Sequence, residues 1–203
     1  MIQSIKRNFT MMSVLLIPIG VAINFIGGQI NSALKLPLFL DTIGTILNSI
    51  LCGPWVGIAT VIVGKAVGSI TSPGYFAFIL VSLGIAITVG NFSRKGFFTS
   101  IPKTLLAMLI TAIVVAIIGS FVRVTFYGGL TGDGSSLIIS ALLANGKAMI
   151  ESVFGVVFIT NFIDKSLSIL ISLLIIRALP DRILSAYPYG EIYIDRKKRL
   201  KNV

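Results

Sequence analysis

The chain lacks histidine, contains one cysteine and carries few charged residues. Among its 203 residues, 55% are hydrophobic and only 12% are charged. One cysteine cannot form a disulfide within the chain. With no histidine and one cysteine, the chain also cannot supply the several histidine or cysteine ligands that hold most protein-bound zinc. We therefore expect no metal site of that kind and no cofactor.

The apolar composition is typical of an integral membrane protein and not of a soluble domain. A helix needs about 20 residues to cross the bilayer core, so the length allows roughly six crossings with short connections. The sequence therefore predicts a single all-α membrane domain over residues 1–203, built as a bundle of six transmembrane helices with an outer substrate basin. The predicted helices are 9–27, 41–52, 55–70, 75–92, 103–126 and 161–179, followed by a basic tail over 180–203.

The predicted helix 41–52 is only about 18 Å long, which is too short to cross the bilayer alone. A Gly53-Pro54 break follows it, and Lys65 lies on the next helix. The two helices run in opposite directions across the membrane, so Asp41 near the start of one and Lys65 near the end of the other come to lie near the same membrane face. Ionisable groups at membrane depth usually face a cavity or a partner. The pair is therefore either part of a binding site or a structural ion pair between two helices.

The positive charges are distributed unevenly along the chain, whose net charge is +10. Six helices place most of the basic residues on one side, which the positive-inside rule makes cytoplasmic. We therefore expect both termini in the cytoplasm, no nucleic-acid partner, and a partly helical outer loop over 127–160. If residues 137–159 also crossed, the basic tail would lie opposite the basic start. The residues on the cytoplasmic side are Lys6, Arg7, Arg94, Lys95, Lys103, Arg177, Arg182, Arg196, Lys197, Lys198, Arg199 and Lys201.

The other ionisable residues predict a polar basin on the outer side. They fall in the outer third of the predicted helices or in the outer loops, above an apolar base. This arrangement is expected of a site that receives a small solute from outside. The set comprises Lys35, Lys65, Arg123, Lys147, Lys165, Asp41, Asp133, Glu151 and Asp164.

Four short stretches share the features of one transporter family. They are Leu36-Pro37 before the short helix, Gly53-Pro54-Trp55-Val56-Gly57 at the next helix, the basic turn Arg94-Lys95-Gly96, and Asn161-Phe162-Ile163-Asp164-Lys165 at the last helix. The last stretch is similar to a Pro-Phe-Asn-x-x-Lys motif. Together with the long outer loop, they resemble the substrate-binding S components of energy-coupling factor (ECF) transporters, which take up micronutrients in prokaryotes.

This resemblance implies a six-helix bundle in a prokaryotic cell membrane that binds a vitamin-like solute at its extracellular face. It also implies three partner subunits: a transmembrane coupling subunit and two cytoplasmic ATPases, whose ATP hydrolysis drives reorientation of the bundle. The chain itself has no G-x-x-x-x-G-K-[ST] phosphate loop. We therefore expect a binding subunit for membrane transport and not an enzyme.

The candidate binding residues come from the first outer loop, the short helix and the segment that leads into the last helix. Asp41, Thr45 and Asn48 share a helix face because their spacing is i, i+4, i+7. Lys147 and Glu151 are four residues apart, so they either pair with each other or contact the solute. Aromatic residues either stack on a planar solute or anchor the chain at the interface. The full set is Asn31, Asp41, Thr45, Asn48, Lys65, Tyr75, Arg123, Tyr127, Lys147, Glu151, Asn161 and Lys165.

A second predicted surface lies on the first helix. Gly20, Asn24 and Gly28 recur every four residues and form one narrow face. Small residues at this spacing allow another helix to approach closely. We expect this face to dock the coupling subunit, or else to pack within the protein.

Two other functions stay open: a membrane sensor or input module, and a lipid-modifying membrane enzyme. The enzyme would need clustered acid-base groups at the cytoplasmic interface, where only Asp181, Glu191 and Asp195 are available. The solute is also open among riboflavin, pantothenate, cobalamin, a pyridoxine-like vitamin and a nucleoside. A large cavity would favour a corrinoid.

Overall fold

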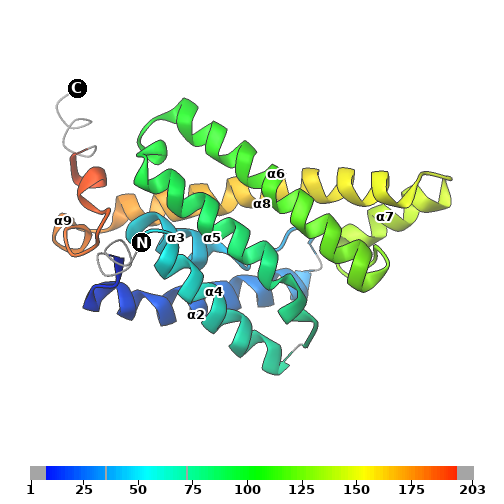
Figure 1. Ribbon diagram of the computed structural model, residues 1–203, viewed down its shortest axis with the longest axis horizontal. Helices are drawn as coiled ribbons and strands as arrows, with labels where there is room; N and C mark the ends of the chain where they lie inside the picture. Colours follow the sequence, from blue (N-terminus) through cyan, green and yellow to red (C-terminus); the bar gives the residue numbers. More distant parts are fainter. Residues whose placement is uncertain (1–7, 35, 72, 196–203) are drawn as a thin grey trace.

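All regular secondary structure is helical in the part of the chain that the structure describes, which is residues 8–34, 36–71 and 73–195 of a computed structural model. The helices are α2 (Met11–Leu34), α3 (Ile43–Cys52), α4 (Pro54–Thr71), α5 (Ile79–Arg94), α6 (Ile101–Tyr127), α7 (Gly134–Ala144), α8 (Met149–Ala178) and α9 (Asp181–Leu184), with 3-10 turns η1 (Pro73–Phe78) and η2 (Phe97–Thr99). Figure 1 shows that α9 and the start of α2 lie at one end of the bundle and α7 at the other.

Four helical stretches are long and apolar enough to cross a membrane: Met11–Leu34, Gly74–Arg94, Ile101–Tyr127 and Met149–Ala178. An all-α, multi-pass membrane protein is therefore supported by length and composition. The helices α3 and α4 fall outside this set. The count of six crossings stays a prediction.

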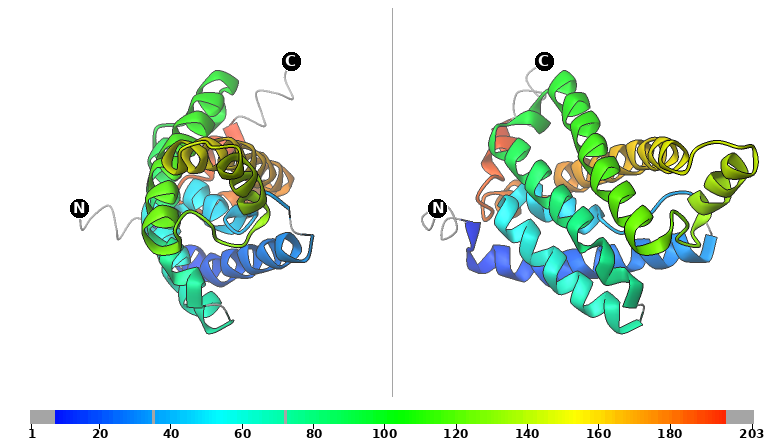
Figure 2. Two further views of the ribbon diagram at one scale, coloured as in Figure 1. Left: turned by 90° about the vertical axis from the view of Figure 1, so that its right-hand side faces the viewer. Right: turned by 45° about the vertical axis from the view of Figure 1, so that its right-hand side comes forward.

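The short helix α3 lies in the centre of the bundle. All ten of its residues are buried, and it contacts α2, α4, α5 and α8, which surround it in Figures 1 and 2. At 1.5 Å per residue it is about 15 Å long. Its length and its complete burial make it a core element, packed against longer helices.

The N-terminal end of α3 receives its hydrogen-bond partner from α2. The first N–H groups of a helix have no acceptor within the helix, and the preceding Thr42 side chain does not cap them. Instead Asn24 Oδ1 accepts from the backbone N–H groups of Gly44 (2.8 Å) and Thr45 (3.3 Å). Asn24 Nδ2 also donates to Thr45 Oγ1 at 2.8 Å. One asparagine therefore joins two helices and satisfies a buried helix end.

The face predicted to dock a coupling subunit is occupied within the chain. Gly20 and Asn24 are buried against α3, and a Cβ at Gly44 would overlap the carbonyl oxygen of Gly20. Gly28 lies beside Asp41 and the Tyr75 hydroxyl instead. The spacing correctly indicates close helix packing, but the partner is internal. Gly20 and Asn24 therefore fit the second expectation for this face, packing within the protein. Docking of a coupling subunit stays a prediction.

Two helices extend beyond their predicted bounds. The helix α2 continues to Leu34 and not to residue 27, and α8 begins at Met149, twelve residues before the predicted start. The segment predicted as an outer loop therefore forms α7 and the first part of α8. The helix α8 continues through Asn161, Asp164 and Lys165 because these polar side chains are buried inside the bundle, where their partners lie, and do not mark a membrane surface.

The segment after α8, which the sequence predicted as part of a basic tail over 180–203, packs onto the end of α3. Leu184, Tyr187 and Tyr193 are buried in the main apolar cluster. The backbone N–H of Tyr189 donates to the carbonyl of Leu51 at 3.0 Å, and Ser93 Oγ donates to the carbonyl of Ile50 at 2.6 Å. The carbonyl end of α3 is thus satisfied by two other segments. Residues 196–203, which hold much of the predicted basic charge, lie outside the described residues.

The contact between α2 and α3 yields a stability prediction. Gly44→Ala places a Cβ against the Gly20 backbone, which cannot move aside as a side chain can. We expect the free energy of unfolding to fall by about 1–3 kcal/mol, measured as a lower melting temperature of the purified protein. The matched control is Gly155→Ala on α8, where a Cβ meets no atom within 4 Å. Equal melting temperatures for the two variants would contradict this packing.

Candidate functional site

A cavity of about 440 Å³ lies between α2, η1, α5, α6, α8 and the loops 36–42 and 128–133; we call it the large cavity. Apolar and aromatic groups line it together with several polar side chains, a composition typical of small-molecule sites. The polar and charged lining residues are Asn31, Ser32, Asp41, Thr42, Lys65, Tyr75, Ser82, Arg123, Tyr127, Thr131, Asp133, Asn161 and Lys165.

Most of the predicted binding residues meet at this cavity: Asn31, Asp41, Lys65, Tyr75, Arg123, Tyr127, Asn161 and Lys165. The remaining four lie elsewhere. Thr45 lines a smaller neighbouring cavity. Asn48 is in the core, where its Nδ2 donates to the Leu16 carbonyl and to Thr60 Oγ1. Lys147 and Glu151 are exposed, line neither cavity and form no ion pair with each other or with other described residues. Lys147 precedes α8, so the two do not share a helix face.

The loop 36–42 is held against the cavity by Asp164, which is completely buried on α8. Asp164 Oδ1 accepts from the backbone N–H groups of Phe39 (3.1 Å) and Leu40 (2.9 Å), and its Oδ2 pairs with Lys165. Lys165 Nζ also donates to Thr42 Oγ1 at 3.0 Å. These contacts fix both backbone and side chains of the loop.

Leu40 has a left-handed backbone conformation, with φ of 52°. This conformation is unfavourable for a residue with a branched side chain and persists only where its surroundings enforce it. The Asp164 hydrogen bond is one such contact. The other is Gly27, where a Cβ would overlap the Leu40 carbonyl oxygen. A glycine on α2 and an aspartate on α8 thus define the path of the loop.

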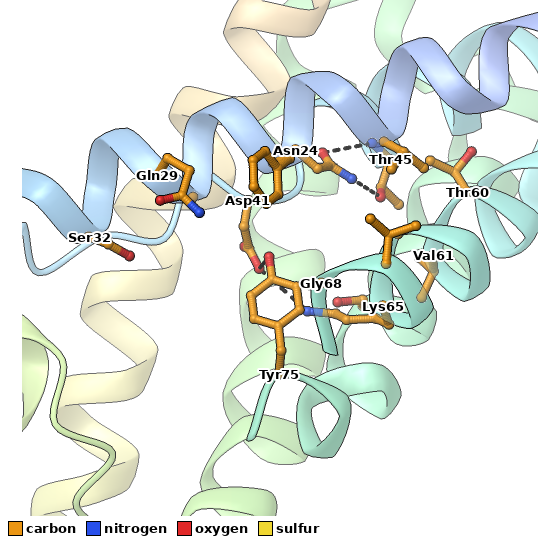
Figure 3. A pocket seen from close by; sticks show the side chains of 16 residues that line it. Asn24, Gln29, Ser32, Asp41, Thr45, Thr60, Val61, Lys65, Gly68 and Tyr75 are labelled. Carbon is orange, nitrogen blue, oxygen red and sulfur yellow. Dashed lines mark hydrogen bonds and ion pairs between the residues drawn. The ribbon is translucent and has the colours of Figure 1, made fainter. Parts of the chain in front are cut away.

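Asp41, Lys65 and Tyr75 form a cluster between the large cavity and its neighbour (Figure 3). Asp41 Oδ2 accepts from the Tyr75 hydroxyl at 2.9 Å and lies 3.5 Å from Lys65 Nζ. Lys65 Nζ also lies 3.7 Å from the centre of the Tyr75 ring, a cation–π contact. The neighbouring cavity, here called the side cavity, measures about 160 Å³, and the three residues line both cavities.

Arg123 and Asp133 close the large cavity beside α7. Arg123 is 2% exposed and its guanidinium pairs with both Asp133 oxygens. Asp133 is also the N-cap of α7, because its Oδ1 accepts from the Ser136 backbone N–H at 3.0 Å and from the Ser135 hydroxyl at 2.7 Å. Burial opposes ionisation of Asp133, but Arg123 and these hydrogen bonds outweigh it, so the pKa of Asp133 lies below its ordinary value.

Aromatic rings form part of the cavity wall. Phe39 has Arg123 Cζ at 5.6 Å and Lys165 Nζ at 5.8 Å from its ring centre. Phe78 and Tyr127 stack with ring centres 5.6 Å apart, and the Tyr127 hydroxyl donates to the Gly74 carbonyl at 2.8 Å. The rings are therefore held in place by the protein itself.

Four residues of the site are not among the predicted binding residues. Phe39, Thr42 and Asp133 line the cavity, and Asp164 organises the loop behind it. The sequence places Asp133 and Asp164 in the predicted basin, but it gives them no binding role. Nothing in the pattern indicated Phe39 or Thr42. Lys35, assigned to the predicted basin, lies outside the described residues.

Within the described ranges, no group of three or more aspartate, glutamate or cysteine residues is placed to hold a metal ion. Comparison with known proteins gives no match to any family model, curated protein or solved structure. The geometry of the cavity is therefore the basis for any functional assignment.

The role of Asp164 can be tested by substitution. Asp164→Ala leaves two backbone N–H groups without an acceptor and Lys165 without its carboxylate partner. Removing one partner of a buried pair costs about 3–5 kcal/mol. We expect a large fall in the melting temperature, and a smaller one for Asp164→Asn, which keeps an acceptor oxygen. Glu151→Ala, at an exposed position, serves as the control. An Asp164→Ala protein as stable as the control would contradict the anchoring role.

The lowered pKa of Asp133 predicts how stability depends on pH. A carboxylate whose pKa is lower in the folded state stabilises the fold above its unfolded pKa, about 3.9, and this stabilisation is lost as pH falls through the folded value. We expect the difference in melting temperature between wild type and Asp133→Asn to be constant near neutral pH and to vanish in acid. A difference that grew with acidification would contradict the assignment.

Proposed function

We propose that the chain binds a small solute in the large cavity and acts as the substrate-binding S component of an ECF-type micronutrient transporter. The observation that carries this proposal is the cavity itself. It lies among apolar helices, and it is within the size range of small-molecule sites. Three buried cations, Lys65, Arg123 and Lys165, border it, although burying an ionised group is otherwise costly.

The construction of the site supports binding. Each carboxylate that borders the large cavity is already engaged by a cation, a hydroxyl or a backbone N–H group. Such fixed, hydrogen-bonded side chains hold their geometry before a solute arrives, which lowers the entropic cost of binding. A preorganised site among membrane helices is what a solute receptor requires.

The remaining parts of the proposal follow from the motifs in the sequence. The chain would associate with a transmembrane coupling subunit and two cytoplasmic ATPases in a prokaryotic cell membrane, with both termini in the cytoplasm. The C-terminal segment and the start of α2 share one end of the bundle (Figure 1), which agrees with this orientation. The coupling subunit would dock on a surface other than Gly20 and Asn24, since these residues contact α3.

The experiment is to purify the chain from cells grown in rich medium and to identify by mass spectrometry the small molecules released on denaturation. We expect one vitamin or nucleoside in near-stoichiometric amount. Asp41→Ala should reduce its occupancy at least about tenfold, because the substitution removes the acceptor that holds Tyr75 and Lys65 at the cavity. Glu151→Ala, distant from both cavities, should retain wild-type occupancy.

Two results would count against this proposal. Release of nothing but lipid from the wild-type chain would contradict solute binding and favour the lipid-modifying enzyme. Unchanged occupancy in Asp41→Ala, with a lower melting temperature, would make the pair of Asp41 with Lys65 purely structural.

A further inference from the structure

The solute class can be narrowed from the size, charge and unpaired polar groups of the large cavity. We infer that the solute is compact, carries no net charge and is built on a flat ring with amide-type N–H groups. This inference rests on the proposed binding function and adds the chemistry of the ligand to it.

The volume limits the solute to a single compact ring system. The cavity of about 440 Å³ is in the lower part of the range for small-molecule sites, about 300–1,000 Å³. A corrinoid with its side chains is larger than this space and would have to extend beyond the cavity, so the volume favours a smaller solute.

The charges around the cavity compensate one another. Among the described residues, the cations that line it are Lys65, Arg123 and Lys165. Lys65 pairs with Asp41, Arg123 with Asp133, and Lys165 with Asp164. All three cations are at least 95% buried, so each pair is largely shielded from solvent. Within residues 8–34, 36–71 and 73–195, no cation that lines the cavity is left without a carboxylate partner to receive an anionic group of a solute.

An anionic solute would therefore have to break one of these pairs. It would leave an aspartate buried without its cation, which is costly in a medium of low dielectric constant. A neutral solute avoids this cost and leaves all three pairs intact. The cavity thus favours neutral over anionic solutes because each of its cations is already paired with an aspartate.

Two asparagine side chains at the cavity can accept hydrogen bonds from a solute. Asn31 Oδ1 is buried and has no hydrogen-bond partner among the described residues. Asn161 also lines the cavity, and its Nδ2 donates to the Val157 carbonyl at 2.8 Å, so its Oδ1 is the atom that can accept from a solute. A buried acceptor without a donor costs free energy. Ring N–H or carboxamide groups of a solute would supply the missing donors.

The walls suit a flat ring. Phe39 lies on one part of the lining, and the stacked pair of Phe78 and Tyr127 lies on another. Aromatic side chains favour offset stacking or edge contacts with planar groups. Size, charge, donors and planarity therefore agree on a neutral nitrogen heterocycle that carries ring N–H or carboxamide groups, such as an unphosphorylated flavin or nucleoside.

The test measures binding of matched probes to the purified full chain in lipid nanodiscs by titration calorimetry. The pairs are riboflavin with its 5′-phosphate, pyridoxine with its 5′-phosphate, and uridine with its 5′-monophosphate; pantothenate and cyanocobalamin are tested alone. We expect at least one neutral probe to bind, its phosphorylated partner to bind at least about tenfold more weakly, and neither pantothenate nor cyanocobalamin to bind.

Variants separate charge from general damage. Asp133→Asn leaves Arg123 without its carboxylate, and Asp41→Asn does the same for Lys65. In each variant, we expect the ratio between the dissociation constants of the phosphorylated probe and its neutral partner to be about tenfold smaller than in wild type. Asn161→Leu should weaken the neutral probe about tenfold, whereas Asn91→Leu, at an exposed position on α5, should not. Melting temperatures identify any variant that fails to fold. If one of the two aspartate variants does not fold, the other one tests the role of charge.

The outcomes distinguish the two levels of the proposal. Tighter binding of a phosphorylated probe, of pantothenate or of cyanocobalamin to the wild-type chain overturns the inference and leaves the binding function standing. Absence of binding by every probe, together with release of lipid alone on denaturation, overturns both.

Discussion

The rest of the structure depends on burying α3 without leaving its end groups unpaired. A helix has N–H and C=O groups without internal partners at its two ends, and the bilayer core offers no water to satisfy them. Asn24 provides acceptors at one end, and Ser93 and the Tyr189 backbone provide donors at the other. These partners come from α2, α5 and the C-terminal segment, so one requirement positions three distant parts of the chain.

Charge burial imposes a second requirement, and it shapes the cavity. Lys65 on α4, Arg123 on α6 and Lys165 on α8 each need a carboxylate nearby, because an isolated buried charge is unfavourable. Asp41 lies in the loop 36–42 and Asp133 in the loop 128–133. The Asp164 side chain accepts hydrogen bonds from the backbone of the loop 36–42. The pairs that neutralise the buried cations therefore also hold the loops that enclose the cavity.

The features that depend on local sequence pattern, such as helix positions, were predicted from the sequence. The features that depend on contacts between distant segments were not. Apolar runs and the Gly53-Pro54 break located α3 and the start of α4 to within two residues. The spacing of Gly20 and Asn24 identified a close-packed face, but periodicity does not show which helix covers it. Asp164 reaches a loop 124 positions earlier in the chain, and no local pattern encodes that distance. For the same reason the polar residues of α8 suggested a helix start, where they are in fact buried within a longer helix.

The packing between the cavity and α9 has a consequence for any solute that enters. An apolar cluster that includes Ile46, Ile50, Ile176, Leu184 and Tyr193 fills this part of the bundle, and protein interiors are packed as densely as organic crystals. A bound molecule would meet close-packed side chains in that direction. On that side the cavity is therefore bounded by close-packed side chains, and a molecule held in it finds no open passage toward α9 through the described residues.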